Sequence, residues 1–201
     1  MTSHRPLPVA QQRHRIAARL VVGCAAGLAA MLAFAAAQWS MQPKESKLTF
    51  VGEQAGAQFE GVFDKFTADI SFDPKDLGHS RFEVKIDTAS VNTQDGERDS
   101  TIKGADLFDV KRFPTARYVA DKFTSAGGNK YSASGKLTLR DVTKDVPIDF
   151  TFENKDGCAW LKGAAKIKRL DFGVGQGEWK DTSTVGNDVQ VRFALRLKGA
   201  S

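Results

Sequence analysis

The residues best suited to acid–base or metal chemistry are few in this 201-residue chain. Three histidines are present, and His79 is the only one beyond residue 37. It follows Asp76 in a Gly-His-Ser stretch typical of a solvated turn, whereas a catalytic triad or a zinc site needs a buried histidine with several partners. We therefore expect no catalytic or metal-binding role for His79.

Two pairs of neighbouring carboxylates could be drawn as an acid–base pair, Asp106 with Asp109 and Glu97 with Asp99. Both pairs lie on a polar segment, where such spacing is typical of a solvated or helix-capping face. The glycines of 173–177 lack the spacing of a dinucleotide-binding loop, and no helical pattern follows them. We expect no catalytic residue, no cofactor and no metal.

Apolar and aromatic side chains carry most of the chemical information. The chain contains 14 Phe, 3 Trp and 2 Tyr. Phe108, Phe113, Phe172 and Trp179 stand where expected strands end, so they could line a mouth that admits an alkyl chain. Plugging of one barrel end by the same rings is the alternative.

Apolar and polar residues alternate through most of the chain after residue 46, as in strands with one buried face. In 188–198, apolar residues hold every second position. The expected strands are 47–53, 58–64, 66–73, 81–91, 115–124, 130–140, 145–154, 158–170 and 187–198. Because the apolar residues of 58–64 and 66–73 are out of phase, we expect one bent strand with a bulge there, which leaves eight strands.

Consecutive antiparallel strands with one apolar face must close into a barrel or stack as a sandwich. We predict an all-β fold, an extended eight-stranded antiparallel lipocalin-like barrel, which has room for side chains or for one slender ligand. The alternation lapses over 94–110, where Asp95 or Asp99 could cap a short helical flap. An outer-membrane barrel is disfavoured, because Glu83, Lys85 and Arg192 lie on the outward face.

The first 37 residues contain four arginines but no Asp, Glu or Lys, and the eighteen residues 20–37 are apolar or small. A basic stretch followed by an apolar run is typical of a secretory signal. We predict a signal peptide over 1–37 cleaved near Ala37, a linker over 38–46 and a barrel domain over 47–199, acting outside the cytoplasm. An uncleaved anchor is the alternative, since the apolar run is near the lower limit for crossing a bilayer.

The charge balance gives no indication of a nucleic-acid partner. The chain has 29 basic and 24 acidic residues, and four of the basic ones belong to the predicted signal. The rest of the chain is thus nearly neutral and lacks the positive excess that nucleic-acid binding requires. After cleavage Cys158 would be the only cysteine, so no internal disulfide is expected and its role stays open.

Several motifs, in the same order along the chain, resemble the YceI-like family. They are Phe-Asp-Pro at 72–74, the segments 86–93, 98–99, 105–110 and 113–115, the hairpin 135–146 and the strand end 169–173. The resemblance covers about residues 46–198. It implies a periplasmic lipocalin-like barrel without catalytic residues that holds a polyisoprenoid, such as a prenyl quinone, in an apolar channel. Thr101 stands where many members have a histidine.

We therefore predict a periplasmic binding or carrier protein for an isoprenoid lipid. The expected ligand-binding residues are Phe82, Val84, Ile86, Phe108, Phe113, Leu137, Leu139, Ile148, Phe150, Phe172, Trp179 and Phe193. Transient contact with a membrane or membrane proteins and a homodimer are left open as further partners. The alternative is an envelope stress-response or interaction protein whose barrel is filled by its own side chains; a hydrolase ranks last.

Overall fold

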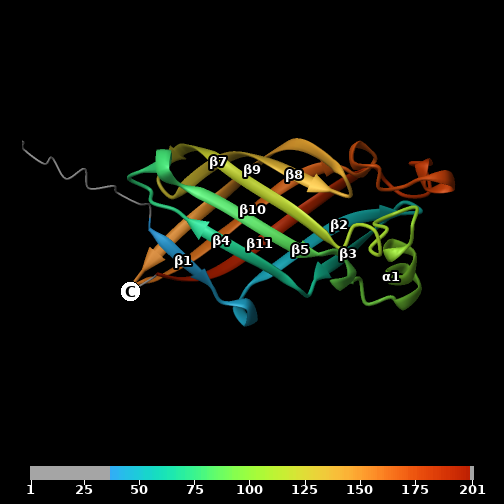
Figure 1. Ribbon diagram of the computed structural model, residues 1–201, viewed down its shortest axis with the longest axis horizontal. Helices are drawn as coiled ribbons and strands as arrows, with labels where there is room; N and C mark the ends of the chain where they lie inside the picture. The colour runs from blue at the N-terminus through green and yellow to red at the C-terminus, as the bar shows by residue number, and fades with distance from the viewer. Residues whose placement is uncertain (1–36, 200–201) are drawn as a thin grey trace, which may run out of the picture. The chain divides into compact units, whose positions relative to one another are not determined.

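The computed structural model describes residues 37–199, which form an antiparallel β-barrel with one short α-helix (Figure 1). The predicted signal peptide falls outside the described residues, except for Ala37. The strands are β1 (Gln38–Met41), β2 (Lys47–Gln54), β3 (Ala57–Phe63), β4 (Phe66–Ser71), β5 (Arg81–Asp87), β6 (Val91–Asn92), β7 (Thr115–Gly127), β8 (Lys130–Leu139), β9 (Val142–Lys155), β10 (Cys158–Lys168) and β11 (Asp188–Gly199). The α-helix is α1 (Gly96–Lys103), and 3-10 turns lie at Pro43–Glu45, Leu77–His79, Thr88–Ser90, Arg169–Phe172 and Gly177–Lys180.

The sheet closes because β1 pairs with both β4 and β11. From β4 the pairing runs through β5, β7, β8, β9 and β10 to β11, and β11 then pairs with β2, which pairs with β3. β1 and β2 lie one after the other along the same neighbouring strand and count as one barrel strand. The same holds for β3 and β4, and for β5 and β6. Within residues 37–199 the strands therefore make eight barrel strands, which confirms the predicted fold.

The expected bend between 58–64 and 66–73 separates β3 from β4. The backbone N–H of Asp64 donates to the carbonyl of Ser90 (3.1 Å), and the N–H of Lys65 donates to the Ser90 hydroxyl (3.0 Å). These bonds supply the partners that the sheet no longer offers at the bend.

The segment 38–46, which we expected to be a linker, contains β1 and enters the barrel wall. Trp39 is buried, its indole N–H donates to the carbonyl of Phe72 (2.9 Å), and its ring meets Phe152 edge-on. A strand of four residues is too short for alternation to reveal it.

The predicted flap corresponds to α1, and Asp95 is its N-cap. The Asp95 carboxylate accepts hydrogen bonds from the backbone N–H groups of Glu97 (3.1 Å) and Arg98 (3.0 Å). The hydrogen bond from the backbone N–H of Arg98 holds the pKa of Asp95 below its ordinary value. Asp99 instead accepts from the backbone N–H and the hydroxyl of Thr93, which fixes the helix to the strand end before it.

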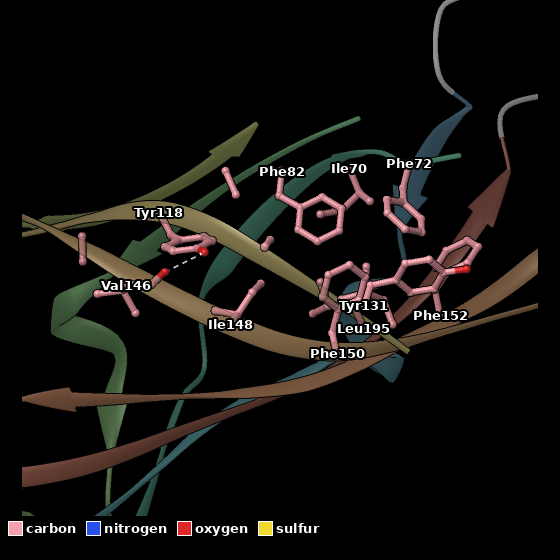
Figure 2. Packing of buried hydrophobic residues seen from close by; sticks show 14 of the residues in the cluster. Ile70, Phe72, Phe82, Tyr118, Tyr131, Val146, Ile148, Phe150, Phe152 and Leu195 are labelled. Atoms are coloured by element: carbon pink, nitrogen blue, oxygen red, sulfur yellow. Dashed lines mark hydrogen bonds between the residues drawn. The ribbon is translucent and has the colours of Figure 1, made fainter. Parts of the chain in front are cut away.

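The barrel end nearest β1 is packed with aromatic rings (Figure 2). Phe72 is fully buried, with its ring centroid 4.9 to 5.7 Å from those of Phe82, Phe123, Tyr131, Phe150 and Phe152. We call these six residues the aromatic cluster. Ring contacts of this kind stabilise a core beyond the area they bury. The helix and the loop after β10 lie at the opposite end (Figure 1).

No helix within residues 37–199 has the length and apolar character needed to cross a membrane.

Candidate functional site

A cavity of about 430 Å³ lies inside the barrel, toward the end covered by α1. Its wall comes from β2 to β5, from β7 to β11, and from α1 with the loops that follow α1 and β10. This volume falls in the range of about 300 to 1,000 Å³ typical of small-molecule sites. Most of the wall is apolar, so the cavity suits a hydrophobic ligand.

Nine of the twelve residues predicted to bind a ligand lie on the cavity wall. They are Phe82, Val84, Ile86, Phe108, Leu137, Leu139, Ile148, Trp179 and Phe193. Most belong to strands whose alternation identified the inward face, and Phe108 and Trp179 come from the loops at the covered end. Their contact with a ligand stays a prediction.

Phe113, Phe150 and Phe172 lie elsewhere. Phe150 points inward but belongs to the aromatic cluster. Phe113 is half-buried, has the guanidinium groups of Arg112 and Arg140 over its ring, and accepts the Thr88 hydroxyl at its carbonyl. Phe172 is buried in the 3-10 turn after β10. Alternation shows which face of a strand is inside, but not how far along the barrel axis a side chain lies.

Phe50, Phe59 and Phe63 of β2 and β3 also lie on the cavity wall, although the predicted set leaves them out. The Phe50 ring packs against Phe59 and Phe63, with centroids 6.2 and 5.4 Å apart. Their alternation within 47–53 and 58–64 was the available signal. The shift of phase at the bend obscured which of these rings face inward.

Glycines on the strands make room for inward aromatic rings at several places, of which Gly61 and Gly163 are examples. A Cβ at Gly61 would lie 2.4 Å from Cζ of Phe50, its partner across the β2–β3 ladder. A Cβ at Gly163 would lie 2.5 Å from Cζ of Phe193, its partner on β11. Each ring therefore lies against strand backbone, which leaves the centre of the barrel open.

Arg98 connects α1 to the β2–β3 hairpin at the edge of the cavity. Its Nε–H donates to Gln54 Oε1 (3.1 Å), and its guanidinium lies 4.5 Å from the centroid of the Phe59 ring. It also forms an ion pair with Asp95 (3.3 Å). Thr101, on the next turn of the helix, is exposed at the same edge. Asp95, Arg98, Gln54 and Thr101 thus form a polar rim at one edge of a mostly apolar cavity.

Arg169 holds the loop that follows β10. It is 5% exposed, and its Nε–H, Nη1 and Nη2 groups donate to the carbonyls of Gly186 (2.9 Å), Val174 (2.9 Å) and Val185 (2.7 Å). Burial lowers its pKa. A Cβ at Gly175 would collide with the guanidinium, so glycine is required there. Three carbonyl dipoles therefore compensate this buried charge.

The acid–base candidates do not form a site in the structure. Nδ1 of His79 lies 2.8 Å from Oδ2 of Asp76, in an exposed contact in the turn before β5. Glu97 is exposed, and Asp99 is engaged by Thr93. At Asp106 the backbone carbonyl accepts the N–H groups of Gly175 and Gln176. In the described part of the chain, no three His, Cys, Asp or Glu residues are grouped to hold a metal.

An eight-stranded antiparallel barrel of this kind has room for its own side chains or for one small ligand, and here it encloses an apolar cavity. The model of the YceI-like domain matches residues 39–197. The chain belongs to the YceI-like family.

Relatives of known sequence support this assignment. A UPF0312 protein of Vibrio vulnificus is 31% identical over 188 residues, which cover 87% of this chain and 95% of the relative. A UPF0312 protein of Azotobacter vinelandii is 36% identical over 141 residues, covering 67% of this chain and 71% of that protein.

Solved structures share the fold. BcnA of Burkholderia cenocepacia has a TM-score of 0.76 at 36% identity, with 78% of this chain and 99% of BcnA covered. A polyisoprenoid binding domain from Saccharophagus degradans has a TM-score of 0.66 at 17% identity, with 81% of this chain and 98% of that domain covered, which shows a common fold alone.

Proposed function

We propose that this protein is a binding protein, not an enzyme, and that it holds an isoprenoid lipid such as a prenyl quinone in the barrel cavity and carries it in the periplasm. The observation that supports this most is the apolar cavity of about 430 Å³ between the polar rim and the aromatic cluster. The Saccharophagus neighbour, whose name states that it binds polyisoprenoids, points in the same direction.

Burial of the lipid tail supplies the driving force. Each 100 Å² or so of apolar surface removed from water contributes about 2.5 kcal/mol, which offsets the loss of freedom of a flexible chain. A cavity walled by preformed strands reduces the cost further, because the protein side need not reorganise. A barrel filled by its own side chains would leave no such space, so the cavity weighs against the alternative function.

The decisive experiment places a bulky side chain in the cavity. Ala165 of β10 lies on the cavity wall, whereas Ala164 pairs with Arg192 and Asp149 on the outer face. We expect Ala165→Phe to weaken binding of a prenyl quinone by about tenfold or more, since the new ring occupies the space of the tail. Ala164→Phe is the matched control and should bind normally.

Native mass spectrometry of both variants gives the bound fraction, and thermal unfolding shows that each remains folded. Extraction of the native protein with organic solvent identifies what it carries. Persistent absence of lipid in the extract, together with no uptake of added prenyl lipid, contradicts the proposal. Fractionation of the source cells tests the periplasmic location separately.

The homodimer that the sequence leaves open would need a free strand edge or contacts between side chains. In the described residues, every strand except β6 has hydrogen-bonded neighbours on both sides over at least part of its length. Residues 121–127 of β7 and 142–148 of β9 pair with a strand on one side only, so they are edges to which a second copy could add a strand. Sedimentation of the purified protein tests for a dimer.

A further inference from the structure

Basic side chains gather on the outer face of β10 and β11. The inward positions of these two paired strands are apolar, so the alternate positions face outward. The outward positions carry one acid, Asp188, and the cations Lys162, Lys166, Lys168, Arg192, Arg196 and Lys198. Arg196 is half-buried and the other cations are exposed. We call these cations the cationic face.

The neighbouring strands extend the cationic face on both sides. Cys158 has Lys155 of β9 on one side and Lys198 of β11 on the other. The row of side chains that contains Lys162 reaches Lys47 of β2. Lys155 and Lys47 are both exposed. Positive charge is therefore continuous from β9 to β2.

Little of this charge is neutralised within the chain. Arg196 forms a long ion pair with Glu45 (3.8 Å), and the other cations of the cationic face form none among residues 37–199. On β5, by contrast, Glu83 is within ion-pair distance of Arg81 and Lys85. The cationic face thus presents a local field to which an anionic partner is complementary.

Trp160 of β10 lies within the cationic face and is half-buried. The Lys162 ammonium lies 5.0 Å, and the Arg196 guanidinium 5.5 Å, from the centroid of the indole ring. No other aromatic side chain occupies an outward position on β8 to β11. An indole among basic side chains is typical of protein surfaces that meet the head-group layer of a membrane.

The composition of the cationic face favours a lipid surface over an acidic protein. The centre of a protein–protein interface usually holds several large apolar side chains and few charges. Here the apolar outward neighbours of the cations are the small Ala164 and Ala194, and Asp149 and Glu153 of β9 add charge at the border. A bilayer asks for a density of cations and not for a matched pattern.

We propose that the cationic face docks on the surface of a membrane rich in anionic phospholipids, with Trp160 in the head-group layer and the basic side chains on the phosphates. The inference goes beyond the proposed function and does not depend on it, because docking of this kind needs no ligand in the cavity.

Sedimentation of the purified protein with vesicles tests the proposal. We expect binding to vesicles of equal parts phosphatidylcholine and phosphatidylglycerol, weaker binding to phosphatidylcholine alone, and release as salt is added. Lys162→Gln/Lys198→Gln should weaken binding by about tenfold or more, since each basic residue near an anionic surface contributes about fivefold. Lys65→Gln/Lys75→Gln removes the same charge from exposed positions beside β4 and should bind like the unaltered protein.

Phosphatidylglycerol with brominated acyl chains shows which part of the barrel meets the membrane, because bromine quenches the fluorescence of nearby indoles. Trp39 is buried and Trp179 lies on the cavity wall, so Trp160 should account for the quenching. We expect Trp160→Phe to lose most of it. Thermal unfolding shows that each variant remains folded.

Four outcomes would overturn the proposal. The first is that anionic vesicles do not bind the protein. The second is an equal loss of binding in the two lysine variants, since attraction would then depend on net charge alone. The third is quenching that persists in Trp160→Phe. The fourth is binding of poly-glutamate without binding of vesicles, which would make an acidic protein the partner of the cationic face.

Discussion

At the residue scale, aromatic rings and glycines face each other across the barrel strands. Gly163 is the most constrained of these glycines: a Cβ there would lie 2.4 Å from the backbone oxygen of Asp149 and 2.5 Å from Cζ of Phe193. Backbone atoms cannot rotate away as a side chain can. The packing of Phe193 against the cavity therefore depends on a missing methyl group.

We expect Gly163→Ala to lower the free energy of unfolding by about 1 to 3 kcal/mol, the usual cost of overpacking a core. Urea unfolding followed by circular dichroism measures it. Gly96→Ala is the control, because no atom lies within 4 Å of a Cβ at that position. Equal stability of the Gly163 variant and the control would show that the barrel adjusts at this point.

The residue scale is also where sequence reasoning reaches its limit. Alternation placed Val84, Ile148 and Phe193 on the inward face, and the structure has them on the cavity wall. The same argument could not separate Phe150 from them, because it lies inward among the aromatic rings. Depth along the barrel depends on the register between strands, which a single sequence does not reveal.

At the element scale, charged side chains join neighbouring strands on the outer face. Glu83 of β5 accepts hydrogen bonds from Arg117 of β7 (3.0 Å) and from Arg81 (3.1 Å), with Lys85 at 3.5 Å. The hydrogen bonds from Arg117 and Arg81 lower the pKa of Glu83 from 4.5 to about 2. One carboxylate thus connects two strands that enclose the cavity.

This shift predicts a pH dependence of stability. Because the pKa of Glu83 is depressed in the folded protein, its contribution is complete above pH 4.5 and is lost as the pH falls toward about 2. We expect Glu83→Gln to flatten the stability profile in this window, and Glu60→Gln to leave it unchanged. Thermal unfolding across that pH range is the measurement, and an unaltered profile for Glu83→Gln contradicts the assignment.

Elements with strong local signals were predictable. The long strands β7 to β11 show clear alternation, and Asp95 marks the start of α1 as a capping residue should. The short strand β1 was not predictable, because its place is decided by Trp39 and by pairing with β4 and β11, both distant in sequence. Closure of the barrel is therefore a property of long-range contacts.

At the scale of the whole molecule, the barrel has an open half and a filled half. Phe72 stands at the centre of the filled half and is completely buried. We expect Phe72→Ala to destabilise the protein by about 3 to 5 kcal/mol and to lengthen the internal space. Chemical denaturation measures the loss of stability.

Binding of prenyl alcohols of increasing length to Phe72→Ala measures how much longer the internal space has become. The proposed function predicts that the wild-type protein has a maximum tail length and that the variant accepts longer tails. Identical length preferences for the two proteins would show that the aromatic cluster does not limit the ligand. Phe123→Ala, at the margin of the same cluster, tests whether one ring is sufficient to close this end.

The aromatic cluster also has a kinetic consequence. With the end nearest β1 closed, the lipid of the proposed function would have to enter and leave at the end covered by α1, and a second lipid could not displace it from behind. Its release rate would then be independent of the concentration of competing lipids. Delivery to an acceptor would accordingly be timed by the residence of the cargo, and not by the supply of the next molecule.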